Sequence, residues 1–293
     1  MEKIKIYDVR EQPGDSAFLL DDGKTAIMYD SGFAFTGYKV ADRIKTILGD
    51  RKLDFIFLTH SHYDHVLGSV YAKKYWPDAK VVAGEYAAKI FSKPTAKAVM
   101  RDLDRKFAKT CGISEYEDLI DELSVDISVS DGDEIIAGDM KFKVVNLPGH
   151  TRCSVGYYCK EENLLLCSES IGVWNGEDDV VPSYLVSYTS SLDSIAKVEN
   201  INPENILIPH FGVLTGEKAK LYLKRAKISA IETTDEIIDM IKQRKTKDEI
   251  IEFFKNKFYH GYVRTIYPID AMKLNTSIMI DLINREIIEG GSN

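Results

Sequence analysis

Residues 54–65 read DFIFLTHSHYDH, a short apolar run followed at once by four side chains that can bind a metal ion. The run is rich in aromatic and branched residues and is short, so it is predicted to be a buried strand rather than a helix. Alternate residues of an extended loop point the same way, so His60 and His62 could reach one ion. Asp64 and His65 lie past the bend and could reach a second. Imidazole and carboxylate are ligands of zinc and similar cations, and three of the six histidines lie in this loop, which favours metal binding over a solvent-facing polar loop.

Three further strand-like runs end close to a side chain that can bind metal. Residues 141–145 lead to His150, residues 164–167 lead to Glu169, and residues 206–208 lead to His210. Five of the six histidines therefore lie at the ends of separate apolar runs. The sixth, His260, lies in a polar segment and is treated as unrelated.

The order of these motifs resembles the metallo-β-lactamase-fold hydrolase superfamily over residues 1–216. The motifs are His-x-His-x-Asp-His at 60–65, Gly-His-Thr at 149–151, an acid at a strand end, and Pro-His-x-Gly at 209–212. By position, the resemblance implies two metal ions: the first is held by His60, His62 and His150, and the second by Asp64, His65 and His210. Asp64 and Glu169 are the candidate catalytic carboxylates.

Glu169 departs from the pattern that it otherwise matches. Where the family normally has an aspartate that bridges both ions, this chain has glutamate, with Ser168 in place of the preceding glycine. Glutamate is one methylene longer, so it could bridge if the backbone recedes, or it could bind one ion only. The metal separation, the relative affinity of the two sites and the metal identity stay open at this point, and a plain salt bridge is the alternative role.

The resemblance also implies an α/β fold, a four-layer αββα sandwich of two mostly antiparallel sheets with helices outside. Local patterns agree with it. Residues 3–9 alternate like an edge strand, and residues 18–29 form a hairpin with Asp-Gly in its turn. Helices are predicted at 37–48 and, after Pro94, at 95–110. The charges of residues 101–109 are assigned to a solvated helix face.

Residues 217–293 are predicted to be a helical C-terminal extension of the catalytic domain 1–216. The Thr-x-x-Glu patterns at 233–236 and 246–249 each predict a helix start, and a last helix is expected from about 270 to 285. The extension resembles helical additions of some thioesterase and glyoxalase-II-like members, where helices cover the active-site entrance. A dimerisation arm or a small helix-turn-helix-like unit are the alternatives.

Several residues near the motifs have two interpretations. Asp30 could support the metal loop, as the resemblance implies, or could simply form a turn. Cys167 is expected to be a buried, inert thiol. Arg152 could bind an anionic substrate group, but a surface carboxylate partner is favoured.

Three aromatic residues after Glu169 could border the site. Trp174, Tyr184 and Tyr188 would then line an apolar substrate pocket, and core or dimer packing is the equal alternative.

Composition limits the function further. The net charge of −8 argues against nucleic acid as a partner, because phosphate binding needs a basic face. Neither a membrane span nor a signal peptide is apparent, and the four cysteines form no disulfide framework, so a cytoplasmic location is expected.

The resemblance places the chain nearest the glyoxalase-II, thioesterase and lactonase branch. The expected function is a metal-dependent hydrolase that uses a metal-bridging hydroxide to cleave a thioester or a related ester or lactone. Its cofactors would be two divalent ions, with zinc favoured over iron or manganese, and its partner would be a small-molecule substrate, with a homodimer possible. A phosphodiesterase or nuclease of the same fold and a non-catalytic regulatory member with an occluded site are the alternatives.

Overall fold

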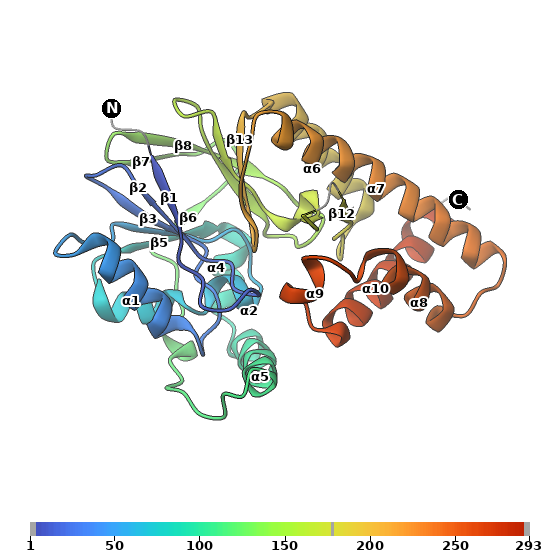
Figure 1. The fold of residues 1–293 in the computed structure, drawn as a ribbon, viewed down its shortest axis with the longest axis horizontal. Helices are drawn as coiled ribbons and strands as arrows, with labels where there is room; N and C mark the ends of the chain where they lie inside the picture. Colours follow the sequence, from blue (N-terminus) through green and yellow to red (C-terminus); the bar gives the residue numbers. More distant parts are fainter. Residues whose placement is uncertain (1–3, 177–178, 290–293) are drawn as a thin grey trace.

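Two six-stranded sheets form the centre of the computed structural model, which describes residues 4–176 and 179–289 (Figure 1). The first sheet contains, in spatial order, β1 (Lys5–Asp8), β2 (Phe18–Asp21), β3 (Ala26–Tyr29), β4 (Phe55–Phe57), β5 (Lys80–Gly84) and β6 (Ile127–Val129). The second contains β14 (Gly212–Thr215), β13 (Asn205–Ile208), β10 (Leu164–Leu166), β9 (Val155–Cys159), β8 (Met140–Asn146) and β7 (Glu134–Ala137). A two-stranded ribbon, β11 (Val173–Trp174) with β12 (Val180–Val181), lies beside them.

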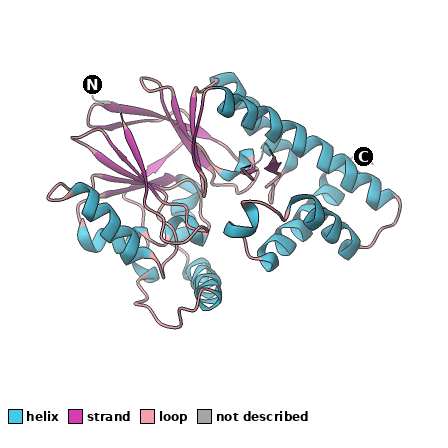
Figure 2. Cartoon of the chain, viewed as in Figure 1, coloured by secondary structure: helices cyan, strands magenta, loops and turns pink. Residues whose placement is uncertain are grey.

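Successive side chains along each strand point to opposite faces of its sheet, and this alternation gives the molecule three apolar layers. On β2, Phe18 and Leu20 pack between the sheets, whereas Leu19 packs beneath the helices that cover the first sheet. Those helices are α1 (Gly37–Leu48), α3 (Ser69–Tyr75) and α4 (Glu85–Phe91). The second sheet is covered by α6 (Tyr188–Ile201) and α7 (Glu217–Lys242). The predicted αββα order of layers is confirmed, and Figure 2 shows the strands between the two groups of helices.

The prediction that both sheets are mostly antiparallel is wrong for the first sheet. Its β3–β4, β4–β5 and β5–β6 pairs are all parallel. Helices run between these strands, and such a crossover returns the chain to the same edge of the sheet before the next strand begins. In the second sheet only the β10–β13 pair is parallel.

The C-terminal region is helical, as predicted, but one predicted helix start is wrong. Helix α7 continues through Thr233 instead of restarting there, and the hydroxyl of Thr234 donates to the carbonyl of Ala230 at 2.7 Å, within the helix. The second capping box is confirmed, because Thr246 and Glu249 cap α8 (Lys247–Phe258) reciprocally.

Beyond α8, the described chain forms α9 (Val263–Ile266), α10 (Ile269–Ile283) and a final helical turn, Asn284–Glu289. These helices share a hydrophobic core with Val173, Val181 and Tyr184 of the ribbon and its flank. Of all the helices within residues 4–176 and 179–289, none has the length and apolar character needed to cross a lipid bilayer.

One charge of helix α5 (Pro94–Thr110) is buried, contrary to the prediction of a solvated face. Asp104 has no exposed surface, and it accepts hydrogen bonds from the Ala34 amide at 2.9 Å and from the Tyr116 hydroxyl. The carboxylate therefore ties α5 to the loop before α1. Burial raises its pKa to about 6, because these hydrogen bonds only partly offset the lost hydration.

We expect Asp104→Asn to change how stability depends on pH. The pKa of the carboxyl is raised in the folded state, so Asp104 contributes stability below about pH 4 that is lost as the pH rises to about 6. Relative to Asp104→Asn, the wild type should lose up to about 3 kcal/mol of unfolding free energy over this range. Urea unfolding of both proteins at about pH 4.5 and about pH 7.5 should show about 2 kcal/mol of this loss, because the rest has already occurred at pH 4.5.

The matched control is Asp102→Asn on the same helix, where the carboxylate is 62% exposed and pairs with Lys106. It should show almost no such pH-dependent difference. Equal pH profiles for Asp104→Asn and the wild type would contradict the raised pKa.

Candidate metal centre

The side chains singled out in the sequence lie together at one edge of the sandwich, where four strands end. His60 and His62 follow β4, Asp64 and His65 lie on α2 (Tyr63–Val66), and His150, Glu169 and His210 follow β8, β10 and β13. They form two groups in which the candidate ligand atoms lie within 4.8 Å of one another: His60, His62, His150 and Glu169; then Asp64, His65 and His210. The predicted residues are thus brought together, and their role as metal ligands stays a prediction. His260 lies outside both groups.

In the first group, three imidazole nitrogens converge on one point. Nδ1 of His62 lies 3.1 Å from Nε2 of His60 and 3.0 Å from Nε2 of His150. Nε2 of His150 is also 2.9 Å from Oε2 of Glu169. His60 and His150 are buried, whereas His62 is partly exposed and marks the side of the group that faces solvent.

In the second group, some buried imidazole nitrogens have no hydrogen-bonding partner among residues 4–176 and 179–289. These are Nε2 of His65 and both ring nitrogens of His210. Oδ2 of Asp64 lies 3.7 Å from Nε2 of each histidine. His210 has a φ of 63°, a left-handed conformation that a non-glycine residue adopts only where the surrounding structure holds it.

Glu169 lies between the two groups. Oε2 is nearest to His150 and also lies 3.6 Å from Nε2 of His60 and 3.7 Å from Nε2 of His65, whereas Oε1 lies 3.3 Å from Nε2 of His210. A carboxylate in this position can contact a cation in either group. The extra methylene of glutamate has therefore not moved the carboxylate away from either set of histidines.

Buried hydrogen bonds to Nδ1, on the side of the ring away from the candidate metal position, orient two of the histidines. Nδ1 of His65 faces Oδ2 of Asp30 at 2.8 Å, and Nδ1 of His150 faces the carbonyl of Ser183 at 2.7 Å. Both oxygens only accept, so in each ring Nδ1 carries a proton, and Nε2 is the ring atom that points into the group. The Ser183 hydroxyl also lies 2.9 Å from Nδ1 of His150. That nitrogen is already a donor and cannot act as a base toward Ser183.

Asp30 organises the metal loop, so the supporting role is the one the structure bears out. Besides His65, it accepts from the Ser16 hydroxyl at 2.8 Å and from the Thr59 amide at 2.9 Å. The Thr59 hydroxyl donates to Asp30 at 3.0 Å, which leaves its oxygen free to accept from Nδ1 of His60 at 3.0 Å. One buried carboxylate thus orients a histidine of each group.

We expect Asp30→Asn to weaken metal binding at the Asp64–His65–His210 group by about 10- to 100-fold, the range typical of outer-shell changes. An amide nitrogen opposite His65 would favour the tautomer with its proton on Nε2, which cannot bind a cation. Competition with a chromophoric chelator measures the affinity. Asp139→Asn, at an exposed carboxylate that pairs with Lys24, is the control, and unchanged affinity in Asp30→Asn would refute the orienting role.

The electrostatics of the first group favour neutral imidazoles at His60 and His62 and an ionised carboxylate at Glu169. Burial, together with the neighbouring histidines, holds the pKa of His60 and of His62 well below the ordinary value. Burial raises the pKa of Glu169, but the surrounding histidines outweigh it and hold the pKa well below its usual range. For His65, burial lowers the pKa, but Asp64 and Asp30 outweigh it and raise the pKa well above normal.

The residues present fit divalent cations. Buried polar nitrogens without partners cost free energy, and the nitrogens of His65 and His210 are buried beside two carboxylates. Neutral imidazole and ionised carboxylate are the forms that bind zinc and related ions. A bound ion would therefore supply the missing interactions.

Two tyrosines of the C-terminal region also reach the site, and neither was predicted from the sequence. The Tyr267 hydroxyl donates to Oε1 of Glu169, and the Tyr262 hydroxyl donates to the carbonyl of His210 at 2.6 Å. Neither lies in a recognisable motif. A tyrosine just before Pro268 in a segment between two helices gives no signal that it returns to a site built about 100 residues earlier.

The other residues considered in the sequence lie away from the clusters. Trp174 and Tyr184 are buried in the core and Tyr188 stacks edge-on against Tyr184, so the packing interpretation is the one the structure supports. Burial raises the pKa of the Cys167 thiol to about 12, as expected for an inert residue, and the four cysteines are free. Arg152 is exposed and forms no ion pair with any side chain in the described ranges, contrary to the favoured prediction.

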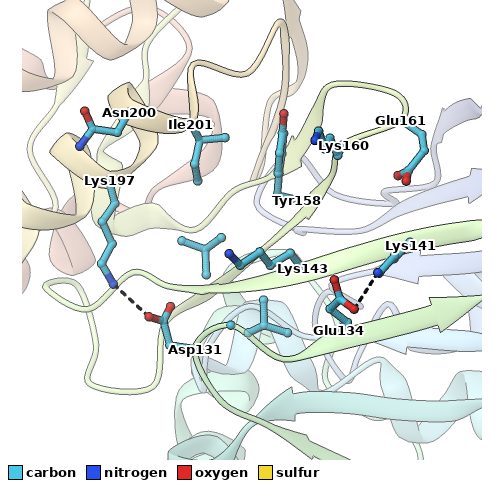
Figure 3. A pocket seen from close by; sticks show the side chains of 13 residues that line it. Asp131, Glu134, Lys141, Lys143, Tyr158, Lys160, Glu161, Lys197, Asn200 and Ile201 are labelled. Atoms are coloured by element: carbon cyan, nitrogen blue, oxygen red, sulfur yellow. Dashed lines mark ion pairs between the residues drawn. The ribbon is translucent and has the colours of Figure 1, made fainter.

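A large open pocket lies elsewhere, on the outer face of the second sheet (Figure 3). It is about 670 Å³ in volume and is lined by charged side chains of β7, β8, the β9–β10 turn and α6. Two of its lysines are paired, Lys141 with Glu134 at 2.7 Å and Lys197 with Asp131 at 3.7 Å. It shares no residue with the histidine groups and is not the candidate site.

Known proteins match both the sequence and the fold. The chain is 28% identical over 173 residues to Glyoxylase B2 of Dictyostelium discoideum, covering 56% of this chain and 54% of that one. It is 29% identical over 123 residues to a hydroxyacylglutathione hydrolase of Ectopseudomonas mendocina, covering 42% of this chain and 35% of that one. The chain thus spans about half or less of the length of these curated relatives.

A solved structure extends the likeness of the fold to almost the whole chain. A metallo-beta-lactamase family protein from Thermus thermophilus superposes with a TM-score of 0.64 at 16% identity, covering 96% of this chain and 94% of that one. The sequence profile of the metallo-beta-lactamase superfamily matches residues 13–210. That match takes in more than half of the 293 residues and every residue of the two groups, and the chain therefore belongs to the metallo-beta-lactamase superfamily.

Proposed function

We propose that this protein is a dinuclear metal-dependent hydrolase that cleaves a thioester or a related ester or lactone. The observation that carries the proposal is the pair of ligand groups with Glu169 between them, whose carboxylate lies near histidines of both groups. Zinc is the favoured ion, because imidazole and carboxylate are usual ligands of catalytic zinc. Membership of the superfamily and the names of the two curated relatives support a hydrolase.

In this proposal each residue has a defined task. His60, His62 and His150 would hold one ion, Asp64, His65 and His210 the other, and Glu169 would contact both. Ions bound there would lower the pKa of a water molecule and polarise the substrate carbonyl. The chain's own part is to keep the imidazoles of His60 and His62 neutral and Glu169 ionised, and to leave the partly exposed His62 and Asp64 facing the entering substrate.

Covalent catalysis is not favoured by the surroundings of the site. Nδ1 of His150 donates to the Ser183 carbonyl and so cannot activate the Ser183 hydroxyl. The Cys167 thiol, with a pKa of about 12, is protonated at neutral pH. A thiolate leaving group needs little protonation, so thioester cleavage does not require a general acid from the chain.

The overall charge of −8 favours a small acyl substrate over a nucleic acid. The cavity between Tyr267 and Ser183 has a volume of about 30 Å³, which is room for one water molecule, so it does not bear on the acyl group.

Metal content and a substrate panel test the proposal together. Protein purified without a His-tag or added metal should contain about two ions per chain by plasma mass spectrometry. It should release thiol from acyl thioesters, and Ser183→Ala should retain most of that activity. Protein that neither contains nor takes up metal would overturn the proposal. Faster cleavage of a phosphodiester than of any ester or thioester would replace it with the phosphodiesterase alternative.

A further inference from the structure

The C-terminal region contributes a polar side chain to the centre of the site. The Tyr267 hydroxyl donates to Oε1 of Glu169, 98 residues away in the chain, and its ring lies 5.8 Å from the ring of His210. Oε1 is the oxygen nearest to His210, at 3.3 Å from its Nε2, whereas Oε2 lies 2.9 Å from Nε2 of His150 and 3.7 Å from Nε2 of His65. Tyr267 therefore contacts one oxygen of the carboxylate and not the other.

The segment that carries Tyr267, residues 259–268, is called the strap here, and it is anchored at several points. The Tyr262 hydroxyl donates to the His210 carbonyl and accepts from Arg10 at 2.7 Å. The Val263 amide donates to the buried side chain of Asn175 at 2.9 Å. These contacts reach three separate parts of the chain, so the strap holds the Tyr267 hydroxyl in place independently of Glu169.

A glutamate in this position needs such a constraint. Compared with aspartate, it has one more rotatable bond, and its terminal torsion is broad and weakly restrained. Without a partner on Oε1, the carboxylate could turn and present both oxygens to the histidines of one group. A fixed donor on Oε1 restricts that rotation and keeps one oxygen on each side.

We propose that Tyr267 is a positioning residue of the metal centre, which orients Glu169 so that Oε1 serves the Asp64–His65–His210 group while Oε2 serves the other. This inference rests on the proposed function, because it presupposes that both groups bind ions. It assigns to the C-terminal region a part in metal binding, beyond any role in covering the entrance. It also predicts an asymmetric effect, since only Oε1 loses a partner when the hydroxyl is removed.

The test is a metal titration of Tyr267→Phe by calorimetry and by chelator competition. The affinity for the ion bound at the Asp64–His65–His210 group should fall about 10-fold or more, the size of an outer-shell effect, with the other affinity unchanged. Cobalt-substituted protein gives a second readout, because the ligand-field spectrum of the affected site should change. Tyr158→Phe is the matched control: it removes a hydroxyl bonded to Asn163 at 2.9 Å on the far side of the second sheet, and it should bind both ions like the wild type.

The outcomes separate this inference from the proposed function. A wild type that binds two ions alongside a Tyr267→Phe variant with the same two affinities would overturn the inference and leave the function intact. Equal weakening of both sites would also overturn it. A visible tyrosinate charge-transfer band in the iron-loaded wild type, lost in Tyr267→Phe, would show a direct ligand instead of a positioning donor. A wild type that binds no ion refutes the proposed function itself.

Discussion

Glu169→Gln is expected to reduce bound metal from two ions per chain to one and to lower thioester hydrolysis by more than about 100-fold. Changes behind a ligand typically cost 10- to 100-fold in affinity or activity, so loss of a charged side chain that faces both groups should cost more. Glutamine keeps the shape of the side chain, but it removes the negative charge that lies among His60, His150 and His210. Plasma mass spectrometry and initial rates on one thioester measure the two effects.

Two further variants show whether the effect is specific. Glu169→Asp keeps the charge but shortens the side chain by one methylene, so from this backbone it should reach one group only and retain intermediate metal content. Glu217→Gln, at a carboxylate that is 89% exposed at the start of α7, should behave like the wild type. If Glu169→Gln kept two ions and full turnover, Glu169 would not join the two groups.

The residues of the candidate site could be foreseen because each belongs to a local pattern. A polar, metal-capable side chain directly after a short apolar run is readable from sequence, and His60, His150 and His210 all follow that rule. Strands that end at one edge of a sandwich bring such residues together. The ligand groups therefore follow from local sequence together with the layered fold.

The contacts that were missed depend on packing between distant segments. Tyr267 reaches Glu169 only because the strap is anchored to Asn175, Arg10 and His210. Asp104 sits among the charges of α5, and only the amide of Ala34 and the hydroxyl of Tyr116 explain its burial. No periodicity within a helix encodes a partner on another element.

The wrong helix start at Thr233 has a similar origin. A Thr-x-x-Glu pattern favours a cap when the preceding residues are free to leave the helix. Here Ala226 and Ala230 pack against the second sheet, while Ile237, the residue directly after the pattern, packs in the C-terminal core. The buried face is continuous across the pattern, so tertiary packing outweighs the local signal and α7 runs on.

Removing the metal is expected to destabilise the folded protein by several kcal/mol. A ligand that binds only the folded state adds about 4 kcal/mol when its free concentration is 1,000 times its dissociation constant. With two sites, stripping both ions should lower the unfolding free energy by up to about twice that amount. Urea unfolding with and without a strong chelator, followed by addition of zinc, measures the loss and its reversal.

The structure gives the reason for coupling metal binding to stability. His60, His65, His150 and His210 each have 2% or less of their surface exposed, so without ions these imidazoles are buried beside one another and beside Glu169. A variant that lacks one ligand in each group, His60→Ala with His210→Ala, is the control, because a chelator should not change its stability. If the chelator lowered the stability of this variant and of the wild type equally, its effect would not come from removing ions from the two groups. If the wild type stripped of metal were as stable as the loaded protein, the fold alone would hold the two groups together. Removal of an ion that binds only the folded state must lower the free energy of unfolding.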